Sequence, residues 1–473
     1  MKLLFNKKTA IIIFVLFVAI IYFFDKGLSV GLFLLGVLSL GTLLILKKLG
    51  FKDKRIYLLF FIALAIHLGV TLFMHYANFQ PFGGGQGDYI TYNNQAQQIA
   101  TRIHSGNFST SGLGIGHLYP VIIGYIYALT LPSEIIGLII NVWLAVLSVL
   151  LVYLIVLELG ASEKNAFVVG LIAAIYPSYV FISGLLLKDV FEVCFVMFGL
   201  LFTFKIIKKF SWWLFLLLYL SLSGATHFRF YIGYALIMAF ILSWFLFSKI
   251  VISKRIVYGV IFVIFLGFIP LFSAGQGYYG FNSFKMYINF KMVNFYRNVA
   301  YVATPNPTSE KTVTLTAPST SVSAVGNEVT PKSLVINKPS VSSESVQEQN
   351  IGMGSSFSGG GGILGYVKSF FYVLFGPFPW QVKNIRQAFA LLETFPWYFL
   401  LIFIGSAIID SIKKKDFKFV VLLIFIIMGM GVIAIFETNF GIIVRIRIPI
   451  FMALLCIASL SQFGTKYLNK INV

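Results

Sequence analysis

Long apolar runs recur along this chain and constrain its fold more than any other feature. A helix needs about 20 apolar residues to cross the hydrocarbon core of a bilayer, with about 17 to 25 as the working range. Runs near this length predict twelve transmembrane helices, at 9–24, 28–46, 56–75, 135–157, 165–183, 190–207, 211–225, 230–248, 256–274, 390–409, 418–436 and 446–463. With 59% hydrophobic and 11% charged residues, the sequence predicts an all-α polytopic membrane protein.

Short basic clusters between the apolar runs set the predicted topology, because cytoplasmic loops carry an excess of Lys and Arg. If the apolar run 117–131 does not span the bilayer, four clusters fall on the same side as both termini, namely 47–55, 205–209, 249–255 and 413–418. If it spans, they divide between the two sides. We therefore predict a helix in the outer interface at 117–131, cytoplasmic termini and a plasma-membrane location. The clusters form no basic domain, so nucleic acid is not an expected partner.

This topology divides the chain into four predicted parts. Residues 1–55 hold two extra N-terminal helices, and 56–274 form a transmembrane core with its first outer loop at 76–134. Residues 275–389 are a large outer loop, and 390–473 hold the C-terminal helices. Within that loop, 303–362 is rich in Ser, Thr and Gly, which predicts a disordered or tethering insert. A Ser/Thr-rich outer segment can also be a glycan acceptor, and this alternative stays open.

Ionisable and aromatic polar side chains gather in five places on the predicted outer rim, where such groups are costly and are therefore functional candidates. We expect the five sets to meet at one site. They are Asp88 with Tyr89 and Tyr92; His117 with Tyr119; Lys188, Asp189 and Glu192; His227 with Arg229 and Tyr231; and Glu437, Asn439, Arg445 and Arg447.

Two of these sets supply the carboxylates. Asp88 is predicted to be a general base that takes a proton from an acceptor hydroxyl, or alternatively a helix N-cap. Asp189 is three residues before Glu192, which places both carboxylates on one helix face. This pair can share a proton or hold an acceptor, and the alternative is again an N-cap, with Lys188 reaching the lipid headgroups.

Three arginines are predicted phosphate ligands, because a guanidinium binds phosphate oxygens in pairs and keeps its charge. Arg445 and Arg447 precede Pro449, and an extended RIR segment would place both guanidiniums on one side. Arg229 is a possible third ligand, whereas His227 alone is better explained as structural. The alternative for the RIR arginines is contact with lipid phosphates.

Nothing in the sequence indicates a cofactor. It contains no DxD pair, with which nucleotide-sugar enzymes typically hold a divalent cation, and its five histidines lack metal-ligand spacing. We therefore expect no cofactor and leave a divalent metal open. The glycines before Asp88 also lack the GK[ST] ending of a phosphate-binding loop. A donor that arrives through the membrane is more plausible than a soluble nucleotide sugar.

The order of these features resembles the GT-C superfamily of membrane glycosyltransferases, in particular the branch of protein O-mannosyltransferases and lipid A aminoarabinose transferases. The likeness covers about 76–250 and 437–460 and includes GDYITYNNQAQQIA, HLYPVIIGYIYAL, AAIYPSYVFISGLLLKDVFEVC, FRFYIGYAL and NFGIIVRIRIPIFMALL. The resemblance implies an outward-facing site, a polyprenyl- or dolichyl-phosphate sugar as donor, and usually inversion at the sugar carbon. It also implies that Asp88 is the catalytic acid/base residue and that Asp189 helps form the site.

The sequence departs from that family in two ways. Tyr89 follows Asp88 where the family often has Asp-Glu, and two extra predicted spans precede the core. We predict a glycosyltransferase that moves a sugar from a polyprenyl-phosphate carrier to a lipid, glycan or protein acceptor. The rival functions are a glycan polymerase or ligase that acts on lipid-linked oligosaccharide, and a lipid-sugar transporter or flippase. A transporter would need ionisable residues near mid-membrane, where this chain has little besides His67.

Overall fold

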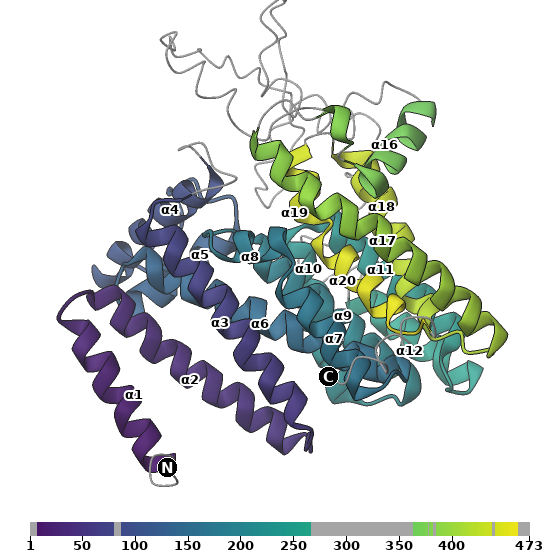
Figure 1. The fold of residues 1–473 in the computed structure, drawn as a ribbon, viewed down its shortest axis with the longest axis horizontal. Helices are drawn as coiled ribbons and strands as arrows, with labels where there is room; N and C mark the ends of the chain where they lie inside the picture. The colour runs from purple at the N-terminus through teal and green to yellow at the C-terminus, as the bar shows by residue number, and fades with distance from the viewer. Residues whose placement is uncertain are drawn as a thin grey trace, which may run out of the picture.

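A computed structural model describes residues 7–79, 87–265, 363–376, 378–381, 385–437 and 440–461. Those residues form helices and no strands, which confirms the predicted all-α class (Figure 1). The predicted insert 303–362, the end of the predicted span 256–274 and Asn439 lie outside them. The helices are α1 (Lys7–Tyr22), α2 (Lys26–Lys48), α3 (Lys54–Tyr76), α4 (Asp88–His104), α5 (Leu118–Leu129), α6 (Glu134–Leu159), α7 (Glu163–Ala174), α8 (Pro177–Ser183), α9 (Asp189–Lys208), α10 (Trp212–Phe228), α11 (Phe230–Phe247), α12 (Ile252–Phe265), α16 (Ile363–Phe375), η1 (Pro379–Gln381), α17 (Ile385–Lys413), α18 (Phe419–Phe436), α19 (Phe440–Ile446) and α20 (Ile448–Ala458).

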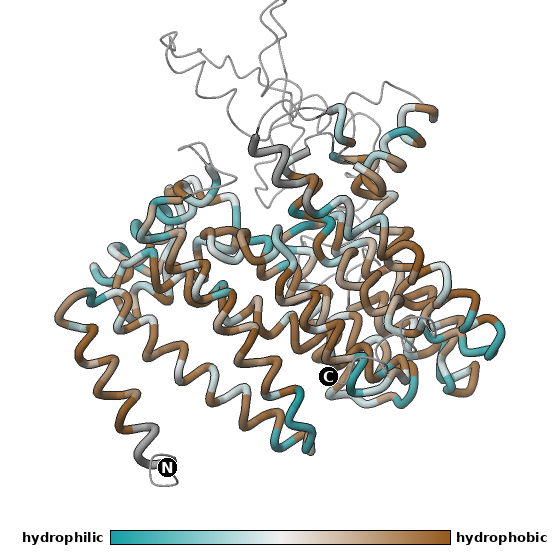
Figure 2. Tube along the Cα trace, viewed as in Figure 1, coloured by the Kyte–Doolittle hydropathy of each residue, from teal (hydrophilic) through white to brown (hydrophobic). Residues whose placement is uncertain are grey.

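Among the described residues, seven helices are long and apolar enough to cross a membrane, namely α2, α3, α6, α9, α11, residues 396–413 of α17, and α18. Figure 2 shows that hydrophobic residues predominate along these helices. The predicted spans at 9–24, 211–225 and 446–463 appear as shorter apolar helices in α1, α10 and α20. Helix α6 is central, because 89% of its apolar window is buried, whereas α2 buries only 22%.

The predicted span 165–183 is not one continuous helix. Its two parts, α7 and α8, meet at an angle of 60°. Pro177 lies in the first turn of α8, and Tyr176 before it has an extended backbone (φ −61°, ψ 112°). A proline cannot donate to the preceding helix and disfavours helical geometry in the residue before it, which explains the break. Helix α8 therefore ends at Ser183, and the turn 184–188 leads directly to Asp189.

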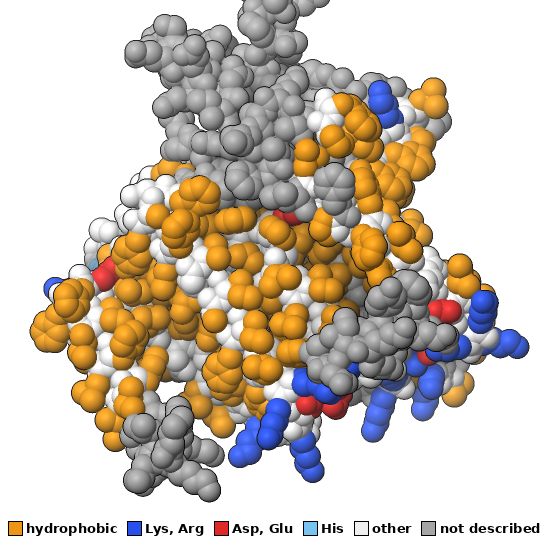
Figure 3. Space-filling view, viewed as in Figure 1, with side chains coloured by type: hydrophobic (Ala, Val, Ile, Leu, Met, Phe, Trp, Pro, Cys, Tyr) orange, Lys and Arg blue, Asp and Glu red, His pale blue; other side chains and the backbone are white. Residues whose placement is uncertain are grey.

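The predicted basic clusters gather at one end of the bundle, where Lys and Arg side chains line one edge of the molecule (Figure 3). Lys208 forms an ion pair with Glu158 near the end of α6. Lys418 lies beside Gly160, which caps the same helix. Asp53, within the cluster 47–55, accepts a hydrogen bond from the Tyr153 hydroxyl of α6 over 3.2 Å. These contacts place three of the four clusters around one helix end, as the non-spanning interpretation of 117–131 requires.

The other end of the bundle carries α4 and α5. Helix α5 has 12 residues and is about 18 Å long, too short for the bilayer core of about 30 Å. It packs mainly against α4. Helix α9 connects the two ends, because it begins at Asp189 and reaches the basic cluster at Lys208 after 20 residues, or about 30 Å. Asp189 and the basic end are therefore separated by about the thickness of a bilayer core.

Candidate active site

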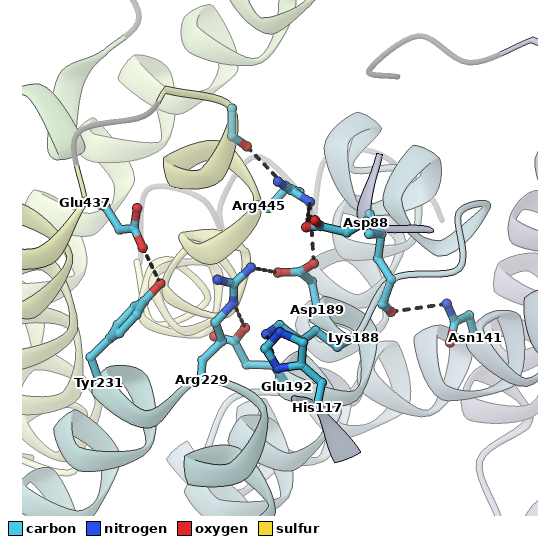
Figure 4. A network of polar contacts seen from close by, with 12 residues as sticks. Asp88, His117, Asn141, Lys188, Asp189, Glu192, Arg229, Tyr231, Glu437 and Arg445 are labelled. Carbon is cyan, nitrogen blue, oxygen red and sulfur yellow. Dashed lines mark hydrogen bonds and ion pairs between the residues drawn. The ribbon is translucent and has the colours of Figure 1, made fainter. Parts of the chain in front are cut away.

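Three residues from distant parts of the chain meet at the end of the bundle where α9 begins (Figure 4). Arg445 Nη1 lies 3.9 Å from Asp88 Oδ2 and 3.9 Å from Asp189 Oδ2. Asp88 is the first residue of α4, and the N-cap is Gly87, so capping does not account for Asp88. Its side chain is 60% exposed, whereas that of Asp189 is 1% exposed. The site thus has one accessible carboxylate above one buried carboxylate, with a cation between them.

Arg229 holds the buried carboxylates in place. Its Nη2 donates to Asp189 Oδ1 over 2.7 Å, and its Nε lies 3.5 Å from Glu192 Oε2. The side chains of both acids are 1% exposed, as expected for two carboxylates on one face of α9 that share a cation. The predicted pair is therefore confirmed as neighbours, but both members face Arg229 and neither is open to solvent. Arg229 is therefore engaged by both carboxylates.

Arg229 reaches this position because the chain turns sharply there. It is the single residue between α10 and α11, with an extended backbone (φ −147°, ψ 93°). Gly233, one turn into α11, allows the two helices to approach closely. A Cβ on Gly233 would lie 2.4 Å from Thr226 Cα and 2.5 Å from its backbone nitrogen. The close crossing of α10 and α11 thus directs Arg229 towards α9.

Lys188 and His117 form the opposite wall of the site. Lys188 Nζ donates to His117 Nδ1 over 3.2 Å. Burial, together with the nearby charges of Lys188 and Arg229, lowers the pKa of His117 to about 4, so the imidazole is neutral near pH 7 and can accept this bond. Burial and the charge of Arg229 lower the pKa of Lys188 to about 8. Lys188 therefore loses its positive charge near pH 8, and its partner His117 is a neutral hydrogen-bond acceptor.

Asn141 is a site-supporting residue that the sequence analysis missed. It is fully buried in α6, and its amide donates to Leu185 O over 2.7 Å and to Leu187 O over 3.3 Å. Tyr119 Oη donates to Asn141 Oδ1 over 3.3 Å. Asn141 thus fixes the turn that carries Lys188 and Asp189. The available signal was a lone amide in the apolar run IIGLIINVWLAV, where a polar side chain needs a partner.

Aromatic residues form the base of the site below the charged groups. The Tyr92 ring contacts the rings of His117 and Tyr119 edge to face, with centroids 5.6 and 5.4 Å apart. Tyr89 is 5% exposed on the same buried face of α4. Tyr92 and Tyr119 therefore orient His117 and Asn141, and burial raises the pKa of Tyr92 above its usual value, which keeps it neutral.

Glu437 and Tyr231 lie at the edge of the network. Tyr231 Oη donates to Glu437 Oε1 over 2.8 Å. Burial raises the pKa of Glu437 despite the nearby charge of Arg229. His227 Nδ1 lies 2.9 Å from Ser223 O of its own helix and not within the charged cluster. This contact agrees with the structural interpretation of His227.

The predicted extended RIR segment is wrong. Helix α19 continues through Ile446, and Arg447 has a helical backbone (φ −75°, ψ −7°), so the two guanidiniums diverge. Arg447 is 3% exposed, donates to Gly376 O over 2.6 Å and lies over the ring of Trp397. Only Arg445 reaches the site. Side chains two residues apart on a helix point about 200° apart. Contacts with Gly376, just after α16, and with Trp397 of α17 hold the second arginine elsewhere.

Within the described ranges, no three His, Cys, Asp or Glu side chains are grouped so as to hold a metal ion. The acids of the site are instead paired with Arg229 and Arg445. The expectation of no cofactor, with a divalent metal left open, stays a prediction.

Comparison with known proteins supports a transferase. Residues 117–273 match the family model described as dolichyl-phosphate-mannose-protein mannosyltransferase. This segment is a third of the chain; it includes His117, Lys188, Asp189 and Arg229 and excludes Asp88 and Arg445. No curated protein and no solved structure matches the chain. The family match, together with the apolar helices, supports a membrane glycosyltransferase of the GT-C superfamily that uses a lipid-linked sugar donor.

Proposed function

We propose that this protein transfers a sugar from a polyprenyl-phosphate carrier to an acceptor hydroxyl at the extracytoplasmic face of the plasma membrane. The observation that carries the proposal is the meeting of Asp88, Asp189 and Arg445 at the end of the bundle opposite the basic clusters. Since basic loops favour the cytoplasm, this end faces outward. An acceptor chain outside the cell and a donor held in the bilayer can both reach it.

Asp88 is the general base in this mechanism. It is the one accessible carboxylate of the three in the charged cluster, because Asp189 and Glu192 are each 1% exposed. Asp88 takes the proton of the acceptor hydroxyl as the hydroxyl oxygen attacks the sugar C1. The bond between C1 and the phosphate oxygen breaks at the same time, and its electrons leave with the polyprenyl phosphate. Attack from the side opposite the leaving group inverts the configuration at C1.

Arg445 and Lys188 stabilise the leaving phosphate. The 3.9 Å contacts of Arg445 Nη1 are longer than the 2.7–2.9 Å typical of a charge-assisted hydrogen bond, so neither carboxylate holds it fully. A phosphate oxygen can therefore compete for this guanidinium. Lys188 lies on the opposite wall and adds a second cation. Fixed cations that meet developing negative charge are often the largest contribution to catalysis.

Asp189 and Glu192 have a different role from the acceptor contact expected from the sequence. They fix Arg229, and the free Oδ2 of Asp189 faces Arg445. Asp189 is thus a positioning residue for both cations, and Arg229 reaches the donor only if the acids release it. Tyr89, Tyr92, His117, Tyr119 and Glu437 form the walls around these groups.

The proposed function is tested by offering purified protein in lipid nanodiscs a set of radiolabelled donors together with membrane extract. We expect label to pass from polyprenyl-phosphate sugars to an acceptor, and not from nucleotide sugars. Transfer from nucleotide sugars alone would reject a lipid-linked donor. Movement of intact lipid-linked sugar between leaflets, without release of polyprenyl phosphate, would instead identify a flippase. The size of the labelled product distinguishes a single transfer from the rival polymerase or ligase.

A further inference from the structure

A polar groove lies on the outward end of the molecule, on the face of α4 away from the bundle. It encloses about 650 Å³ and is open to solvent. Leu113 of the loop 105–116 lines its opposite wall. Its residues on α4 recur at helical spacing over about three turns. They are Asn94, Gln97, Gln98, Thr101 and Arg102, and Ser105 follows them as the C-cap of the helix.

The lining of this groove is rich in amides and contains no carboxylate. The side chains of Asn94, Gln97 and Gln98 make no hydrogen bond within the described part of the chain. Each amide offers two donors and one acceptor. The single charged residue, Arg102, is already occupied, because its Nη1 donates to Ser109 O over 3.0 Å and to Ser111 O over 2.6 Å. The groove therefore matches an uncharged ligand that carries many hydroxyl groups.

Both walls of the groove belong to segments that also carry residues of the candidate active site. Helix α4 begins at Asp88, so Asn94 lies about 9 Å further along the same helix. The loop 105–116 ends at His117, whose ring contacts Tyr92 of α4. Arg102 of α4 hydrogen-bonds to Ser109 and Ser111 of this loop and thereby fixes the distance between the loop and the helix. A chain bound in the groove can thus place one end near Asp88.

We propose that this groove binds the acceptor, and that the acceptor is a neutral glycan chain. This inference rests on the proposed function, because it names the acceptor class for the same site. The free amides of Asn94, Gln97 and Gln98 hold sugar hydroxyls remote from the reacting end. The terminal sugar then extends to Asp88, which takes the proton from its attacking hydroxyl. Binding energy far from the reaction orients that hydroxyl.

The test uses full-length protein in lipid nanodiscs and glycans released from the envelope of the source cells, sized and labelled with a fluorophore. Fluorescence anisotropy compares wild type with the triple variant Asn94→Ala, Gln97→Ala, Gln98→Ala. Alanine is the best helix former, so α4 is retained. The matched control is Thr91→Ala with Gln95→Ala, two positions of α4 outside the groove. We expect a neutral glycan fraction to bind wild type and the control with similar affinity. Its affinity for the triple variant should be lower by at least about tenfold.

Equal affinity for wild type and the triple variant would overturn the inference. The inference would also be overturned if no neutral fraction bound to wild type. The same holds if a Ser/Thr-rich peptide displaced the labelled glycan and its binding depended on the same three amides. Hydrolysis of polyprenyl-phosphate sugar, measured in parallel without acceptor, keeps the two proposals separate. Normal hydrolysis by the triple variant with lost glycan binding supports the groove. If wild type binds glycan through the groove but consumes no donor, the proposed function is rejected and the groove assignment stands.

Discussion

Asp88 Oδ2 lies 3.9 Å from Arg445 Nη1, although Asp88 begins the first outer helix and Arg445 lies near the C-terminal end of the described chain. The pair is close enough to share one ligand and too far apart to satisfy each other by a hydrogen bond. A base and a cation held in this way can act on the two ends of one reaction, the acceptor hydroxyl and the leaving phosphate. The following predictions depend on this arrangement.

Replacing Arg445 should slow the chemical step. In Arg445→Gln, the leaving phosphate loses a fixed cation, and kcat should fall about 10²- to 10³-fold, the range for loss of one oxyanion donor. The measurement is transfer from a polyprenyl-phosphate sugar at saturating donor.

Arg447→Gln is the matched control, because it changes the same residue type two positions away. Its loss removes a buried hydrogen bond to Gly376 O and the contact with Trp397. We expect a stability decrease of about 1–3 kcal/mol, seen as a lower Tm, with kcat of the folded protein nearly unchanged. Equal losses of kcat in both variants would show that the two arginines do not have separate roles.

Donor binding should weaken at alkaline pH. Lys188 has a lowered pKa of about 8, so it is cationic below this pH and neutral above it. A neutral amine cannot attract phosphate, so donor KM should rise about tenfold between pH 7 and pH 9. In Lys188→Arg the charge persists, since a guanidinium stays protonated throughout this pH range, and donor KM should not change with pH. A wild-type donor KM that is constant to pH 9 would contradict a role for Lys188 in phosphate binding.

Asn141 should act through the turn that it supports. Asn141→Leu leaves the Leu187 carbonyl without its amide donor, at about 1–3 kcal/mol, whereas Leu185 O keeps the hydrogen bond that Leu187 N donates over 2.8 Å. Lys188 and Asp189 then lose their fixed positions, so kcat should fall and the rise of donor KM near pH 8 should shift.

The control for Asn141 is Asn165→Leu, which removes a buried amide bonded to Ser459 O at 3.1 Å, at the basic end. It should lower Tm without moving the pH dependence of donor KM. If both asparagine variants shift that pH dependence equally, the effect is general destabilisation and not positioning.

The sequence predicted the all-α class of fold from its apolar runs. Basic clusters predicted the sidedness, which stays a prediction. The cost of polar groups at the rim singled out Asp88, Asp189 and Arg445, which the structure brings together. The diverging RIR arginines were not predictable in this way. Arg447 is held by Gly376, far away in sequence, so its direction depends on tertiary packing. The partners of Asn141 likewise lie 44 and 46 residues further along the chain, beyond α7 and α8, and the local sequence does not reveal them.

The most direct test of the account is single-turnover transfer by Asp88→Asn, with the preferred polyprenyl-phosphate sugar and acceptor. The substitution keeps the shape of an exposed side chain and removes its basicity together with its negative charge, so folding should be unchanged. We predict transfer at least about a hundredfold slower than wild type, within the range of a lost general base. Transfer at the wild-type rate would show that Asp88 is not the base and would contradict the central claim.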